Sequence, residues 1–146
     1  MRGKVLAAVA LVVVLVGCKT QPAAVQGPPV AVQASAAADT LWGTSLPAAL
    51  QQAQTQSKPV IVDFFATWCG PCKMLEQTWA DPQVSVVLSG FVTVKIDADE
   101  QPALAQQYNV TGLPTVVFLG PDGQEKHRQV GYMAAPEMRK LLDKYR

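Results

Sequence analysis

The sequence is poor in the residues that usually build metal sites and networks of disulfides. Its 146 residues include three cysteines and one histidine. Cys18 stands alone and Cys69 and Cys72 form a pair, so there is no framework of disulfides like those of small secreted proteins. Two cysteines leave the coordination of a structural zinc ion incomplete, and we expect His127 to be exposed and not a ligand. The pattern favours cysteines that carry out chemistry.

The sequence also lacks an excess of positive or negative charge. The formal net charge is +1, and without the first 17 residues, which hold Arg2 and Lys4, it is 10 − 11 = −1. Neither value favours a nucleic-acid partner. Asp97, Asp99 and Glu100 lack the glycine and the terminal glutamate of a calcium loop, so we interpret them as the solvated start of a helix.

No hydrophobic run is long enough for an ordinary membrane-spanning helix. Residues 5–16 are uncharged and follow Arg2 and Lys4, but a spanning helix needs about 20 apolar residues. The run matches the hydrophobic region of a signal peptide, predicted over residues 1–17. It ends in Leu15-Val16-Gly17-Cys18, which resembles the lipobox of bacterial lipoproteins.

The lipobox resemblance implies that Cys18 becomes the acylated first residue of the mature protein and inserts into a lipid bilayer. The protein would then lie in the periplasm, and Lys19, by resemblance to lipoprotein sorting rules, favours the outer membrane. An ordinary secretory signal with an unrelated cysteine is the alternative. Residues 18–40 are rich in Ala, Gln and Pro and are predicted to be a flexible linker. One folded domain is expected over residues 41–146.

Hydrophobic periodicity and capping residues predict an α/β domain. The expected order is a helix near 46–53, a strand at 60–65, a helix after 69, a short helix from 82 to about 90, a strand at 91–96, a helix at 102–108, strands at 115–119 and 124–130, and a final helix from 136. Such an order predicts a mixed central sheet with helices on both faces.

Trp68-Cys69-Gly70-Pro71-Cys72 places two thiols one helical turn apart, where a buried strand turns into a helix. The free N–H groups and the dipole at the start of the helix favour a thiolate at Cys69, which is therefore the expected nucleophile. Cys72 lies one turn further in, and we expect it to resolve the mixed disulfide and to be less exposed. Asp63 lies six residues before Cys69 in an apolar strand, where its carboxylate is costly to bury.

The chain resembles thioredoxin, and more narrowly the C-terminal thioredoxin-like domain of the membrane reductase DsbD, over about residues 41–146. The segments that carry the resemblance are Lys58-Pro59-Val60, Asp63-Phe64-Phe65-Ala66, Trp68-Cys69-Gly70-Pro71-Cys72, Asp81-Pro82-Gln83-Val84, Gly112-Leu113-Pro114-Thr115 and Val130-Gly131-Tyr132. The resemblance implies a thioredoxin fold and a thiol:disulfide oxidoreductase with no cofactor beyond its own redox-active disulfide.

The resemblance also implies roles for individual residues. Asp63 exchanges a proton with Cys72, a role that a raised pKa would suit; alternatively, its side chain escapes to solvent at a strand edge. The lysine that accompanies this aspartate in thioredoxin aligns with Thr93, so that part of the family pattern is missing. Separately from the resemblance, Trp42 and Trp79 are interpreted as packing residues or as covers at the edge of the domain.

A second set of implied roles concerns substrate binding. Pro114 matches the cis-proline of the family, which leaves the backbone of Leu113 free to pair with an extended substrate; a trans proline that starts a strand is the alternative. Trp68 would shield the dithiol and contribute to docking. Gly70 and Pro71 are the pair found in reducing thioredoxins, whereas oxidising and isomerising relatives usually carry a histidine there.

The leading hypothesis is a monomeric protein disulfide reductase of the periplasm, which receives electrons from a membrane donor of the DsbD type and passes them to disulfides in other proteins. One alternative is a disulfide oxidase or isomerase. Another is a metal-binding or chaperone-like module that uses the fold without turnover.

Overall fold

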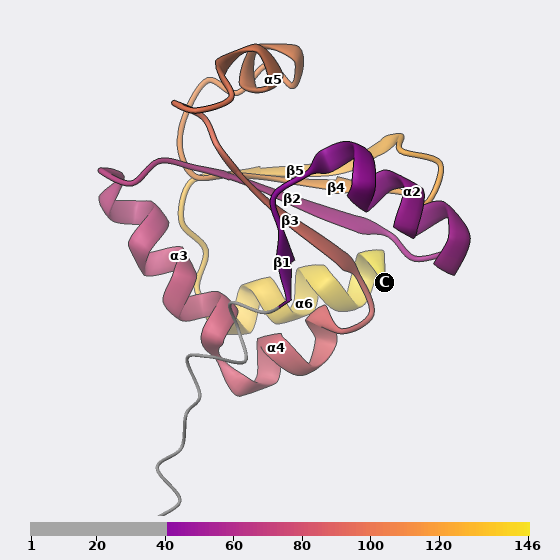
Figure 1. Cartoon of the computed structure of the whole chain (residues 1–146). Coiled ribbons are helices and arrows are strands. Elements are labelled where there is room, and N and C mark those ends of the chain that lie inside the picture. Colours follow the sequence, from indigo (N-terminus) through magenta and orange to yellow (C-terminus); the bar gives the residue numbers. More distant parts are fainter. Residues whose placement is uncertain (1–40) are drawn as a thin grey trace, which may run out of the picture. The chain divides into compact units, whose positions relative to one another are not determined.

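The computed structural model describes residues 41–146 (Figure 1). The predicted signal peptide at 1–17, the predicted lipid attachment at Cys18 and the predicted linker at 18–40 lie outside the described residues. No helix in residues 41–146 is long and apolar enough to cross a membrane.

A five-stranded mixed sheet forms the centre of the domain, in the order β1-β3-β2-β4-β5. The strands are β1 (Trp42–Gly43), β2 (Val60–Phe65), β3 (Val92–Asp97), β4 (Thr115–Leu119) and β5 (Glu125–Val130). β1, β3 and β2 run parallel, whereas β4 is antiparallel to both β2 and β5. β2 is therefore a central strand, as its nearly continuous apolar sequence predicts.

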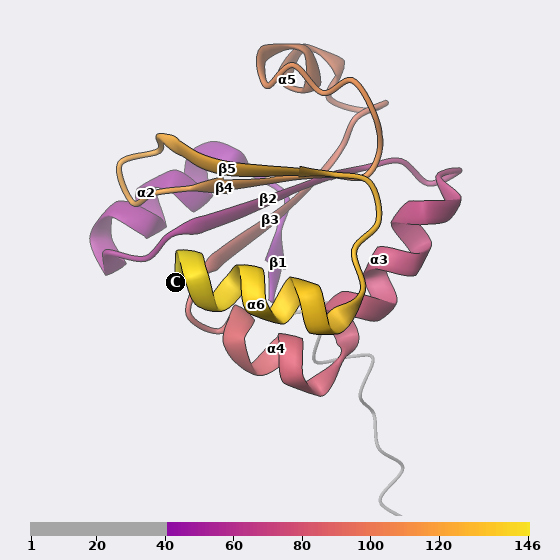
Figure 2. The same cartoon turned by 180° about the vertical axis from the view of Figure 1, so that it is seen from behind.

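Helices cover both faces of this sheet, as Figures 1 and 2 show from opposite sides. They are α2 (Leu46–Gln56), α3 (Gly70–Ala80), α4 (Pro82–Leu88), α5 (Pro102–Gln107) and α6 (Ala135–Tyr145). Alternate residues of β2 supply the two cores: Val62 and Phe64 pack with residues of α2, and Ile61 packs with residues of α3, α4 and α6. The predicted α/β class and thioredoxin fold are confirmed.

Local signals in the sequence explain where several helices begin. Ser45 accepts a hydrogen bond from the backbone N–H of Ala48, and Asp81 accepts one from that of Gln83. Both residues are N-caps, and each satisfies a backbone N–H that has no partner inside its helix. α6 begins at Ala135, one residue before the predicted start, without a side-chain cap.

The structure differs from the sequence predictions at two other places. The short strand β1 was not predicted, because two residues are too few to show a periodic pattern. His127 is half-buried, not exposed, because its ring stacks on that of Tyr145 with centroids 5.0 Å apart. This contact joins β5 to α6, a pairing that neither local sequence reveals.

Candidate active site

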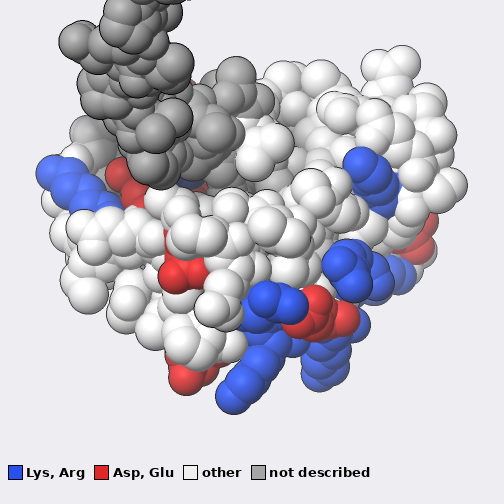
Figure 3. Space-filling model, turned by 90° about the horizontal axis from the view of Figure 1, so that it is seen from below, with Lys and Arg blue, Asp and Glu red and all other residues white. Residues whose placement is uncertain are grey.

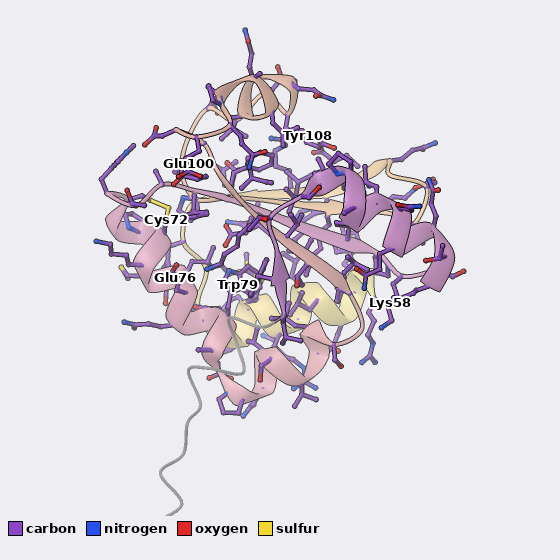
Figure 4. The ribbon with its side chains drawn as sticks, viewed as in Figure 1. Lys58, Cys72, Glu76, Trp79, Glu100 and Tyr108 are labelled. Carbon is purple, nitrogen blue, oxygen red and sulfur yellow. A yellow bond between two sulfur atoms is a disulfide. The ribbon has the colours of Figure 1, made fainter. Side chains whose placement is uncertain are left out.

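Cys69 and Cys72 are joined by a disulfide at the start of α3 (Figure 4). Cys69 is the N-cap of this helix, and its sulfur accepts a hydrogen bond from the backbone N–H of Cys72 at 3.2 Å. Pro71 occupies the first turn, where a missing N–H has no consequence for the helix. The backbone thus directs a donor and the positive end of the helix dipole at the sulfur of Cys69.

In this disulfide form the two cysteines are almost equally buried, so the expectation that Cys72 is the less exposed of the two is not confirmed. The exposed fractions are 3% for Cys69 and 4% for Cys72. Both cysteines pack in one small cluster with Ala66, and Leu113 lies against it. Trp68, by contrast, is 69% exposed, so it adds a large apolar surface beside the disulfide.

Asp63 is buried in the middle of the sheet, with an exposed fraction of 2%. Its Oδ2 accepts a hydrogen bond from Nε1 of Trp79 at 3.0 Å, and its Oδ1 has no hydrogen-bond partner. Burial raises the pKa of Asp63 to about 6, against the opposing effects of the Lys95 charge and the Trp79 hydrogen bond, while the charge of Glu76 adds to the increase. The alternative of a carboxylate solvated at a strand edge is wrong, because β2 has a neighbour on each side.

A lysine lies near Asp63 after all. Thr93 occupies the position where the family pattern has a lysine, and its hydroxyl donates to the backbone carbonyl of Leu41. Lys95, however, is the register partner of Asp63 in the pairing of β2 with β3. Lys95 and Thr93 lie on the same face of β3, because side chains alternate along a strand. The cation near Asp63 therefore lies two residues further along the same strand than the family pattern predicts.

Lys95 is held in place by an ion pair and by aromatic rings. Its Nζ lies 3.1 Å from a carboxylate oxygen of Glu76, 5.5 Å from the ring centroid of Trp42 and 5.7 Å from that of Phe65. All three neighbours lie on different elements, namely α3, β1 and β2. The position of the Lys95 ammonium group therefore depends on the packing of these three elements around it.

The interpretation of Trp79 as only a packing residue is incomplete. Its ring is buried and packs against that of Trp42, with centroids 5.3 Å apart, and its N–H binds Asp63. Figure 4 shows Glu76 and Trp79 on α3, the helix that begins at the disulfide. One helix thus carries both cysteines and two residues that act on the buried carboxylate.

The loop before β4 completes the site. The Leu113–Pro114 peptide bond is cis, so the alternative of a trans proline is wrong. Gly131, whose φ is +85°, donates its backbone N–H to the carbonyl of Pro114 at 2.8 Å. Within residues 41–146, Leu113 takes part in no backbone hydrogen bond. Its N–H and C=O can therefore pair with another chain.

A groove of about 470 Å³ runs beside the disulfide. It is lined by Trp68, Cys69, Gly70, Pro71, Ala98, Ala105, Val110, Thr111, Gly112 and Leu113. Most of these side chains are apolar or absent, so the groove suits an extended peptide segment with small or apolar side chains.

Two acidic residues that we interpreted as solvated also contribute to this site. Oδ2 of Asp99 accepts a hydrogen bond from Nε1 of Trp68 at 2.7 Å. Oδ1 of Asp97 accepts from the backbone N–H groups of Asp99 and Glu100, at 2.9 and 3.4 Å. The loop after β3 therefore fixes the orientation of Trp68. In the part of the chain that the structure describes, no three His, Cys, Asp or Glu residues come together as possible metal ligands.

Comparison with known proteins agrees with this geometry. The thioredoxin family model matches residues 44–144. The chain belongs to the thioredoxin family. A thioredoxin-like protein of Synechocystis is 44% identical over 85 residues, which cover 56% of this chain and 75% of that protein. The thioredoxin of Mycoplasma pneumoniae is 41% identical over 83 residues, covering 57% of this chain and 78% of that protein.

Solved structures of thioredoxins share the fold. The solution structure of a thioredoxin from Thermus thermophilus matches with a TM-score of 0.65 and 33% identity, over 71% of this chain and 85% of that one. With its disulfide at the start of α3, the domain is a thiol:disulfide oxidoreductase of the thioredoxin family.

Proposed function

We propose that this thioredoxin-family protein is a reductant of protein disulfides in the bacterial periplasm. The observation that carries the proposal is the position of Cys69 as the N-cap of α3, with the N–H of Cys72 directed at its sulfur. A donor and a helix dipole at that place stabilise a thiolate, which is the form of cysteine that attacks a disulfide.

The reaction runs in two exchanges. In the reduced protein, the thiolate of Cys69 attacks one sulfur of a substrate disulfide, forms a mixed disulfide and releases the other substrate sulfur as a thiolate, which takes up a proton. Cys72 then loses its proton to Asp63 and attacks the sulfur of Cys69. The Cys69–Cys72 disulfide forms, the second substrate thiol is released, and two electrons have passed from the protein to its substrate.

The groove beside the disulfide would hold the substrate during these steps. The free backbone groups of Leu113 pair with the extended substrate segment, and Pro114, which follows in a cis peptide bond, has no N–H that could compete there. Gly70 and Pro71 leave room for the substrate over the cysteines, and the exposed ring of Trp68 adds apolar contact. The binding residues thus surround the attacking sulfur.

The pair Gly70 and Pro71 favours the reducing direction. A histidine between the cysteines would stabilise the reduced form and make the protein a stronger oxidant, and this chain has none there. A disulfide oxidase or isomerase is the second candidate. A potential close to about −120 mV, that of the strong oxidant DsbA, would overturn the choice of a reductase. A metal-binding or chaperone-like module is the third. Metal that stays bound in stoichiometric amount after purification would support it.

The proposed location rests on Cys18, as the acylated residue of a lipoprotein, and on Lys19, which favours the outer membrane. An oxidising compartment would keep the Cys69–Cys72 pair oxidised unless a dedicated donor reduces it. A membrane donor of the DsbD type would supply these electrons, and the disulfides of periplasmic proteins would receive them.

Reduction of insulin tests the activity. The chain, reduced beforehand, should reduce insulin disulfides, and Cys69→Ser should lower the rate to that of the reductant alone. Cys18→Ser, the same exchange outside the site, is the control and should retain the rate. Full activity in Cys69→Ser would refute the proposal.

A further inference from the structure

An uncompensated group of negative charges lies beside the active site. Asp97, Asp99 and Glu100 occupy the end of β3 and the loop that leads to α5, and Asp99 and Glu100 are exposed. The four ion pairs within residues 41–146 involve other acidic residues, namely Glu76, Asp122, Glu125 and Asp143. The loop therefore carries a formal charge of −3 that no ion pair of the described chain offsets.

This loop borders the groove next to the disulfide. Ala98, between the first two acids, lines the groove together with Trp68. The hydrogen bond from Trp68 to Asp99 and the bonds that Asp97 accepts from the loop backbone hold these groups together. The carboxylate of Asp99 is thus held at Trp68, one of the residues that line the groove. The exposed side chain of Glu100 follows it in the loop, and Asp97 and Glu100 line a neighbouring hollow together with Lys95. Figure 4 shows Glu100 near the same end of the domain as Cys72.

Basic residues gather on another part of the molecule. α6 and the residue after it contain Arg139, Lys140, Lys144 and Arg146, against Glu137 and Asp143, which leaves 4 − 2 = +2. Figure 3 shows Lys and Arg side chains gathered on the side of the molecule that α4 and α6 cover. Near the disulfide, Lys95 is paired with Glu76, and Lys73 on α3 is the nearby cation without an ion pair in the described residues. The charge of the domain is therefore segregated, with the disulfide toward its negative end.

We propose that the groove selects cationic substrates: a cysteine-containing segment whose apolar residues lie in the groove and whose lysine or arginine side chains reach Asp99 and Glu100. The inference rests on the proposed reductase function and names the substrate class for it.

Two physical effects produce the selection. Opposite charges at the rim of a contact raise the rate of encounter, most strongly at low ionic strength. Once the segment is docked, each exposed pair of opposite charges adds a modest gain, about twofold to fivefold in the rate constant. Substrates with acidic side chains at the same positions meet repulsion of similar size. The preference is therefore a graded one that salt weakens, since the Debye length shrinks to about 8 Å at physiological ionic strength.

Three synthetic peptides test the inference. Each has one cysteine flanked by alanine and valine, in mixed disulfide with thionitrobenzoate, and two outer positions that are both Lys, both Gln or both Glu. The full chain, reduced and freed of reductant, attacks the peptide sulfur through Cys69 and releases coloured thionitrobenzoate; Cys72 then releases the peptide thiol. We expect the second-order rate constant to fall from Lys to Gln to Glu, with about a tenfold span at 20 mM salt and a small span at 500 mM.

Matched variants locate the effect. Glu100→Gln and Asp99→Asn, which keeps an acceptor for Trp68, should each reduce the ratio of the Lys to the Glu rate by about twofold to fivefold. Glu137→Gln makes the same change in charge on α6 and should leave the ratio unchanged. Equal rates for all three peptides, or a preference that both loop variants retain, would overturn the inference while leaving the reductase proposal intact. A failure to react with the Gln peptide would instead refute the reductase proposal itself.

Discussion

Asp63 shows how the folded environment changes the chemistry of a single residue. In water a carboxyl group of this kind releases its proton near pH 3.8, but here burial raises its pKa to about 6. Trp79 binds one of its oxygens and leaves Oδ1 without a partner. A carboxyl group with this pKa can accept a proton from a nearby thiol and return it within the range of ordinary pH.

Removing the charge of Asp63 should stabilise the protein at neutral pH. The folded state holds the proton up to about pH 6, whereas the unfolded state releases it near the ordinary value of 3.8. Stability therefore falls as the pH rises between these values, by about 3 kcal/mol, since one pKa unit corresponds to about 1.4 kcal/mol. Asp63→Asn should be more stable than the wild type by about that amount at pH 7.5, and the difference should disappear near pH 4. Denaturant unfolding at several pH values measures it.

Asp143→Asn is the control for this experiment, because Asp143 is an exposed partner of Arg139 on α6. It should show no comparable gain in stability between pH 4 and 7.5. A gain of the same size and pH dependence in both variants would contradict the assignment to the buried carboxyl group.

At the scale of elements, the register of β2 and β3 decides which charges meet. The pairing sets Asp63 opposite Lys95, and α3 brings Glu76 to the same lysine. A shift of one residue in either strand would put Asp63 and Lys95 on opposite faces of the sheet. The electrostatic environment of the site is therefore a property of strand pairing.

Replacing Lys95 by methionine should move the pH dependence of activity. The positive charge of Lys95 lowers the pKa of Asp63, so its loss should raise that pKa above about 6. A higher pH is then needed to form the carboxylate that accepts the proton of Cys72. The loss of insulin-reducing activity at low pH should therefore begin at a higher pH in Lys95→Met than in the wild type.

Lys73→Met, which removes an exposed cation from α3, is the control and should lose activity at the same pH as the wild type. If Lys95→Met also loses activity at the same pH as the wild type, the role of Lys95 is contradicted.

At the scale of the whole molecule, the proposed lipid anchor would keep the redox domain at a membrane, and the proposed electron donor is itself a membrane protein. Cys18→Ser removes the only residue to which the sequence assigns acylation. In a bacterial host, the variant should leave the membrane fraction for the soluble fraction, while the purified protein still reduces insulin. Fractionation followed by immunoblotting measures this, and an unchanged membrane fraction would argue for an ordinary signal or another anchor.

Much of the fold and of the candidate site could be predicted from the sequence. The α/β order followed from apolar periodicity, the starts of α2 and α4 from Ser45 and Asp81, and the redox pair from Trp68-Cys69-Gly70-Pro71-Cys72. These features depend on residues within a few positions of one another, and local patterns are sufficient to predict them. The location of the protein and its electron donor remain predictions from the region around Cys18.

Only the tertiary structure decided which distant residues act on the site. The bond from Trp79 to Asp63 spans 16 residues, and that from Trp68 to Asp99 spans 31. Lys95 was missed because the aligned position is Thr93, and strand register alone sets which side chain of β3 faces the carboxylate. The sequence by itself determined the redox chemistry, since the two thiols and the helix start are contiguous. The proton affinity of Asp63 and the charge around the groove arise only where helices, strands and loops far apart in the chain pack together.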